Sequence, residues 1–142
     1  MPARHLTIVH YPLPRGSGWY CDEVDRPEWD AVAAAIRNMD DDEHPIVQLS
    51  WKAVESGFDD MESFNIIGGA AAGFALFECE AGWQFDDPAG GDEDVHLWRS
   101  DQGYFCKRRN IISDVETVLR LARTYFDTGS FEAVEREARH GL

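Results

Sequence analysis

The chain has 142 residues and carries 27 aspartates and glutamates against 13 lysines and arginines, so its formal net charge at pH 7 is −14. A polyanion of this kind repels nucleic acid and anionic membranes, which excludes both as expected partners, and it attracts cationic proteins. A chain of this length is expected to form one domain, over residues 1–142, that buries roughly two thirds of its unfolded surface.

The cysteines and the first residues of the chain indicate the cellular compartment of the protein. The three cysteines, Cys21, Cys79 and Cys106, are odd in number and far apart, which is typical of a reducing environment rather than of a disulfide framework. No basic segment followed by an apolar one opens the chain, and no run reaches the roughly 18 apolar residues of a membrane helix. We therefore expect a cytoplasmic protein that is monomeric when free, because like charges repel.

The N-terminal segment predicts a strand and then a helix. Residues 6–9 form a short β-branched run, and the prolines and glycines of residues 11–18 indicate an irregular loop after it. Asp25 stands three residues before Glu28, with Pro27 between them, and this pattern predicts a capped helix over residues 27–39. Helical spacing places four apolar residues on one face: Trp29, Val32, Ala33 and Ile36.

The middle of the chain predicts an antiparallel meander. Three strand-like runs, at residues 46–51, 63–67 and 73–79, are separated by acidic and glycine-rich connections. Two shorter runs follow at residues 95–98 and 104–107. With these, the sheet is expected to have five or six strands.

The C-terminal segment predicts a second amphipathic helix. Ser113 and Glu116 form a capping-box pattern, and Gly129 supplies a stop signal. Residues 131–142 then either form a short helix or fray. Strands in a run, with helices near the two ends, predict an α+β fold in which helices pack on one face of an antiparallel sheet.

Motifs for catalysis, metal binding and cofactor binding are missing from the sequence. The five histidines never fall in a pair at metal-binding helical spacing, and there is no Cys-x-x-Cys. The glycines of residues 68–73 lack the lysine and spacing of a phosphate-binding loop and predict a turn. We expect no metal, no cofactor and no catalytic residue, although a site assembled only in space leaves an orphan enzyme as an alternative.

Charged clusters are the most informative feature. Residues 40–43, 59–60, 86–87 and 92–94 are acidic, and three of these clusters lie beside an aromatic residue. They are either solvated loops or a docking surface for a cationic partner. The basic run 107–109 is expected to form internal ion pairs rather than to bind nucleic acid.

For a docking surface, we expect aromatic residues to anchor and carboxylates to steer. The residues favoured for this role are Trp83, Phe85, Asp86, Asp87, Asp92, Glu93 and Asp94, followed by Phe58, Asp59 and Asp60. Trp83 and Phe85 alternate as strand residues do, so packing in the core is the alternative for them.

Residues 113–131, SDVETVLRLARTYFDTGSF, resemble the closing helix of the first-numbered immunity-protein family of bacterial polymorphic toxin systems. The predicted helix and strand at 29–51, and the pair of strands around the glycine-rich turn at 64–77, agree with that family. The resemblance covers residues 29–131 and does not extend to the loop at 11–24. It implies a protein encoded beside a nucleic-acid deaminase toxin, which neutralises that toxin by binding it.

The charge pattern agrees with this implied function. A toxin that acts on DNA or RNA needs a basic, aromatic-lined groove, and a polyanionic protein can fill it by placing carboxylates where phosphates would lie. The chain lacks the His-x-Glu and Pro-Cys-x-x-Cys motifs of a zinc deaminase, so it is not the toxin. The alternatives are the orphan enzyme and an acidic adaptor or DNA mimic that binds another basic protein.

Overall fold

A computed structural model describes residues 5–14, 16–51, 63–78, 82–101 and 103–140. The elements in chain order are β1 (His5–His10), β2 (Tyr20–Asp25), α1 (Trp29–Arg37), β3 (Ile46–Ser50), β4 (Ser63–Gly69), β5 (Gly73–Glu78), β6 (Asp94–Leu97), β7 (Tyr104–Lys107), a 3-10 turn (Arg108–Asn110), β8 (Ile111–Ile112), α2 (Val115–Thr128) and α3 (Phe131–His140).

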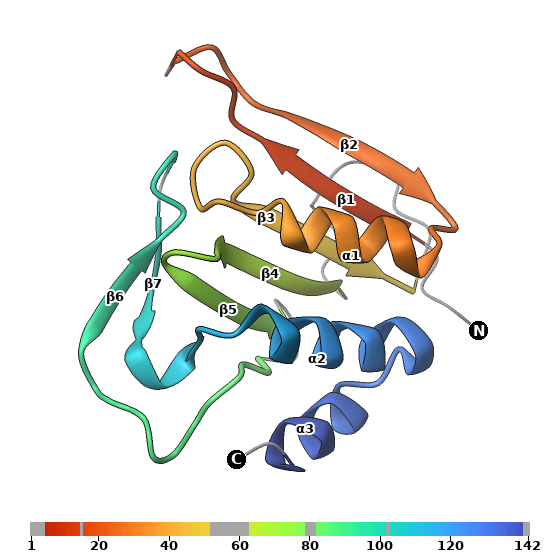
Figure 1. Cartoon of the computed structure of the whole chain (residues 1–142), viewed down its shortest axis with the longest axis vertical. Helices are drawn as coiled ribbons and strands as arrows, with labels where there is room; N and C mark the ends of the chain where they lie inside the picture. The colour runs from red at the N-terminus through yellow and green to blue at the C-terminus, as the bar shows by residue number, and fades with distance from the viewer. Residues whose placement is uncertain (1–4, 15, 52–62, 79–81, 102, 141–142) are drawn as a thin grey trace.

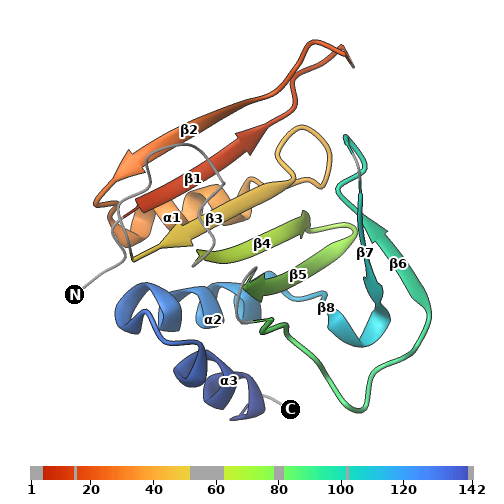
Figure 2. The same ribbon diagram turned by 180° about the vertical axis from the view of Figure 1, so that it is seen from behind.

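The main sheet has six antiparallel strands in the order β2-β1-β3-β4-β5-β8. The three helices lie on one face of it, as Figure 1 shows from the helix side and Figure 2 from behind. The predicted α+β class, the antiparallel meander of β3, β4 and β5, and the single helical layer are therefore confirmed. None of the described helices combines the length and apolar character needed to cross a membrane.

Alternation along the strands builds the core between the sheet and the helices. Leu49 faces Leu6 on β1 and Phe64 on β4, and all three side chains are fully buried. Phe64 stacks on Tyr125 of α2 at 5.1 Å between ring centroids and on Phe131 of α3 at 6.0 Å. Phe64 therefore joins the central strand to both C-terminal helices.

The strands β6 and β7 differ from the prediction. They pair with each other in a separate two-stranded sheet instead of extending the main one. Val95 and Leu97 of this hairpin are buried against the second face of the main sheet, in a cluster with Ile46 and Ile67. A hairpin has the same alternation whether it joins a sheet or packs across it, so the sequence pattern does not distinguish the two.

The two strands that complete the main sheet were not predicted. β2 lies between the loop expected at 11–18 and the helix expected at 27–39, where no strand was predicted, and its sequence YCDEVD carries three carboxylates and almost no buried residue. β8 has only two residues. Edge strands of this kind lack the half-buried alternation that identifies a strand in a sequence.

The helix ends show which capping signals are used. Asp25 ends β2 and Arg26 has a φ of 51°, so the predicted box with Glu28 does not form and α1 begins at Trp29. At α2 the cap is Asp114 rather than Ser113, because its carboxylate accepts from the Glu116 N–H. The predicted stop at Gly129 is confirmed by its left-handed φ of 65°.

Replacing Phe64 with alanine tests the central packing. The substitution removes a fully buried ring from the contact with both helices, so we expect the free energy of unfolding to fall by about 3–5 kcal/mol. Phe105→Ala is the matched control, since Phe105 is 71% exposed, and it should change stability by no more than about 0.5 kcal/mol. Urea denaturation of both variants measures this; similar losses in the two would contradict the assignment of the core.

Candidate functional site

The aromatic residues expected to anchor a partner are part of the core. Phe85 is only 5% exposed and belongs to the cluster between sheet and helices. Trp83 is half-buried, its ring lies 5.5 Å from that of Phe131, and its Nε1–H donates to Glu135 at 3.1 Å. Phe85 therefore lies in the core and Trp83 packs against it, which is the alternative expected for both.

The carboxylates of the same region are paired with the basic run. Arg109 donates to both oxygens of Asp86, at 2.6 and 2.9 Å, and holds the pKa of that carboxyl below its usual range. Lys107 lies 2.6 Å from Asp94, and weaker pairs join Arg108 to Glu93 at 4.0 Å and Arg109 to Asp92 at 3.7 Å. The internal ion pairing expected for residues 107–109 is confirmed.

The remaining predicted residues are Asp87 and the residues 58–60. Asp87 holds a turn, because its carboxylate accepts from the Ala89 N–H and its own N–H donates to the Arg109 carbonyl. Phe58, Asp59 and Asp60 lie outside the described residues. A hollow of about 620 Å³ beside β7 includes Asp94 and Lys107 in its lining, and these two charges neutralise each other.

Charge compensation extends over the helices. Among the described residues, every lysine and arginine apart from Arg26 forms an ion pair with a carboxylate. The pairs on the helical side are Arg37–Glu116, Arg120–Glu137, Arg123–Asp127, Arg136–Glu132 and Arg139–Glu135. The cations thus offset part of the negative charge around β7 and on the helices.

Three connections lie close together at one end of the sheet. They are 11–19 between β1 and β2, 38–45 between α1 and β3, and 98–103 between β6 and β7. Figure 1 shows them side by side at the upper left. Tyr11 joins them, because its N–H donates to the Glu43 carbonyl at 2.8 Å and its hydroxyl to Asp101 at 2.6 Å. We call the described residues of these connections, together with His10 and Tyr20–Asp22, the loop end.

Asp41 fastens the β6–β7 hairpin to the loop end. Its side chain is 1% exposed and accepts from the Trp98 N–H at 2.6 Å and from Arg99 Nε at 3.2 Å. Burial raises the pKa of Asp41, while the bonds from Trp98 and Arg99 act in the opposite direction. Asp41 and Trp98 both have positive φ values, 64° and 59°, so the two backbones turn sharply where they meet.

Large aromatic surfaces are exposed at the loop end. Trp19 is 50% exposed and Tyr20 52%, and the neighbouring Leu13 is 57% exposed. Each ring is backed by another ring: Trp19 stacks on Tyr11 at 6.3 Å and Tyr20 on His10 at 4.7 Å. These side chains are pre-positioned and at the same time accessible, which is what an interface anchor requires.

Carboxylates surround these aromatics, and the described part of the loop end holds few lysines or arginines. One of these carboxylates, Asp22, lies 2.8 Å from Nε2 of His10. Asp22, Asp40, Glu43 and Asp101 belong to the loop end, and within its described residues Arg99 is the one lysine or arginine. Arg99 is bound to the buried Asp41. The loop end therefore keeps its negative charge.

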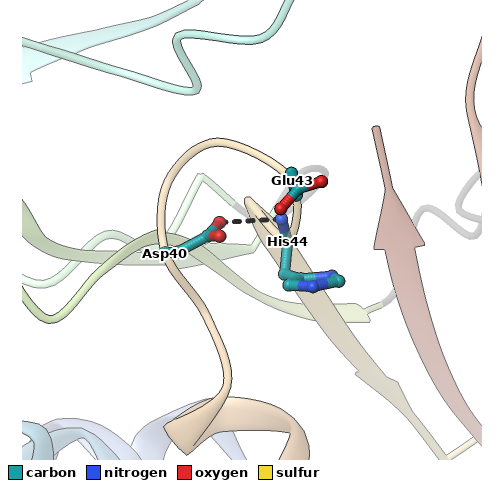
Figure 3. Close-up of side chains that lie close together, drawn as sticks. All are labelled: Asp40, Glu43 and His44. Atoms are coloured by element: carbon teal, nitrogen blue, oxygen red, sulfur yellow. Dashed lines mark hydrogen bonds between the residues drawn. The ribbon is translucent and has the colours of Figure 1, made fainter. Parts of the chain in front are cut away.

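Asp40, Glu43 and His44 form the one group in the described part of the chain that could hold a metal ion. Each offers a ligand atom, and these atoms lie within 4.8 Å of one another (Figure 3). Asp40 already accepts from the backbone N–H groups of Asp42, at 2.9 Å, and of His44, at 2.8 Å. These bonds hold the 38–45 connection and explain the position of Asp40 without an ion.

Sequence reasoning missed the loop end because its parts are distant in the chain. Residues 40–43 were recognised as an acidic cluster, but no aromatic residue adjoins them in sequence. Trp19 and Tyr20 come from a segment interpreted as a loop. The usable signal was a pair of large aromatics inside a polar segment, where no core strand or helix requires them.

Asp41→Ala tests how the loop end is held. The change leaves the Trp98 N–H and Arg99 without their acceptor, so the free energy of unfolding should fall by about 1–3 kcal/mol. Asp92→Ala is the control, because its side chain is 86% exposed, and it should change stability by about 0.5 kcal/mol or less. Thermal denaturation compares the two. Equal, small effects would show that Asp41 does not fasten the hairpin.

Comparison of the chain with protein-family models, with curated proteins and with solved structures gives no match. Support for a function therefore comes from the arrangement of its own residues.

Proposed function

We propose that this protein is an immunity protein, which binds a cognate bacterial toxin domain with a basic surface and blocks its substrate site in the cytoplasm of the producing cell. One observation carries the proposal: exposed aromatic side chains stand among several carboxylates at the loop end, where Arg99 is the one described lysine or arginine. The nature of the toxin, a nucleic-acid deaminase, rests on the resemblance of residues 113–131 and on the substrate that such a basic groove would hold.

The loop end has the chemistry that this role requires. Carboxylates at the positions of substrate phosphates compete for the cationic groups of a nucleic-acid groove, and aromatic rings replace the stacking of bases. Long-range attraction between opposite charges speeds association with the toxin. A standard interface takes about 800 Å² from each partner, which is roughly a tenth of the 7309 Å² surface of this protein.

The region around β7 supports this role less well. A partner that used Asp86 or Asp94 would have to replace Arg109 or Lys107, which already bind these carboxylates at 2.6 Å. The net attraction would be smaller, because one ion pair is exchanged for another. We therefore place the docking surface at the loop end rather than at the acidic residues 86–94.

Co-expression tests the partner. If the gene beside this one encodes a toxin domain, expression of that domain alone should stop growth, and co-expression with this protein should restore growth and yield a complex that co-purifies. Continued arrest with no complex would contradict the immunity role. Tight binding to an unrelated basic protein instead would favour the acidic adaptor.

Trp19→Ala tests the surface. Since Trp19 is a half-exposed ring supported by Tyr11, its removal should weaken binding of the toxin by at least about 2 kcal/mol, or roughly 30-fold. Phe105→Ala removes another exposed ring, on β7, and should leave affinity nearly unchanged. Calorimetric titration measures both. A larger loss for Phe105→Ala would move the interface to the β6–β7 hairpin.

Two charge-reversal variants test whether the charge of the loop end speeds association. Glu43→Lys at the loop end and Glu132→Lys on α3 change the net charge equally, and Glu132 is 84% exposed. We expect Glu43→Lys to slow association by about tenfold at low salt and to flatten its salt dependence, because the charge lies within the interface. Glu132→Lys should have a clearly smaller effect in stopped-flow measurements. Identical rates for the two variants would show that only the total charge matters.

A further inference from the structure

The strand β2 is an open edge of the main sheet. It pairs with β1 over six residue pairs, from His5 with Asp25 to His10 with Tyr20, and no other strand of the described residues pairs with its second side. Figures 1 and 2 show it at the outer border of the sheet, beyond α1. Backbone N–H and C=O groups along such an edge are available to another strand.

Both faces of β2 are also accessible. Tyr20, Asp22 and Val24 point to the helix side, because they face His10, Ile8 and Leu6 across the pair. Five of the six residues are exposed, and Cys21 is half-buried. A strand that is open at its edge and on both faces leaves room for the backbone and the side chains of an added strand.

Charge selects what can be added. Asp22, Glu23 and Asp25 are all exposed, so pairing of two copies through this edge would place carboxylates opposite carboxylates in a chain of net charge −14. Like charges across a strand pair are destabilising, while opposite charges stabilise it. The edge therefore disfavours a second copy of the protein and favours a cationic strand.

The order of side chains defines that strand further. On the helix side a carboxylate stands between two apolar residues, since Asp22 is flanked by Tyr20, 52% exposed, and Val24, 37% exposed. Glu23 and Asp25 lie on the opposite side of the strand. Because successive side chains point to opposite faces, a segment in which lysine or arginine alternates with β-branched or aromatic residues places its cations beside Glu23 and Asp25 and its apolar side chains beside Tyr20 and Val24. Trp19 and Tyr20 lead from the loop end directly into this edge, so one partner can contact both.

We infer that β2 binds a basic extended segment of the partner protein as a seventh strand of the main sheet. This inference rests on the proposed function, which it deepens by naming the element of the toxin that is recognised: a segment in which lysine or arginine alternates with β-branched or aromatic residues. The backbone edge supplies affinity for any extended chain, and the carboxylates restrict it to cationic ones.

Two peptides of equal charge separate strand addition from simple attraction. The first is acetyl-Lys-Val-Lys-Val-Lys-Val-amide, and the second has proline in place of each valine, which prevents pairing in a ladder. With a fluorescent label and at low salt, the valine peptide should bind the protein at least about tenfold more tightly than the proline peptide, and amide signals of residues 20–25 should shift in NMR spectra. Equal affinities, or shifts confined to other elements, would overturn the inference.

Charge variants locate the site. Asp25→Lys, at the end of β2, should weaken binding of the valine peptide by at least about fivefold relative to Glu132→Lys on α3, with thermal denaturation confirming that both variants fold. Equal losses in the two would overturn the inference. Concentration-dependent dimers of the unmodified protein that the valine peptide does not dissociate would also overturn it, because the edge would then be occupied by a second copy.

The outcome for the toxin is separate. A toxin that is neutralised equally by unmodified protein and by Asp25→Lys, without shifts in residues 20–25, would leave the immunity role intact and refute strand addition. If instead the valine peptide binds at β2 but co-expression gives no rescue, the proposed function fails while the strand site stands.

Discussion

Ion pairing within the molecule decides where the surface stays negative. Lysines and arginines are half as numerous as carboxylates, and the structure places most of the described ones around β7 and on the helices, each beside a carboxylate. The loop end receives one described arginine, Arg99, which is held by the buried Asp41. The end where Trp19 and Tyr20 are exposed therefore keeps a negative charge.

The buried carboxylate of Asp41 also holds two segments of the fold together. Asp41 lies in an acidic run, yet it is the member that turns inward and accepts from the backbone of Trp98. A buried carboxylate is stable only when donors replace the lost water, and Trp98 and Arg99 supply them. This arrangement fixes the β6–β7 hairpin against the 38–45 connection, and Tyr11 ties both to the start of the β1–β2 connection.

Different groups of this surface contribute different parts of the binding. The carboxylates of the loop end act over a Debye length, roughly 8–10 Å at moderate salt, and accelerate encounter. Rings that are already stacked, such as Trp19 on Tyr11, lose little conformational freedom when a partner covers them. The open edge of β2 adds directional backbone bonds, so attraction, anchoring and alignment come from adjacent parts of one surface.

The sequence by itself determined the elements whose signals are local: the helix ending at Gly129, the meander of β3 to β5 and the internal pairing of residues 107–109 follow from capping, alternation and charge. Only the tertiary structure decided that Phe85 and Trp83 pack in the core, that β6 and β7 cross the sheet instead of joining it, and that Asp41 is buried. These outcomes depend on contacts between residues that are distant in the sequence. At the loop end, for example, Tyr11 stacks on Trp19 and donates its N–H to the Glu43 carbonyl. Periodicity reports that a side chain is half-buried, but it does not report what covers it, because neighbours in space are set by packing over long sequence separations.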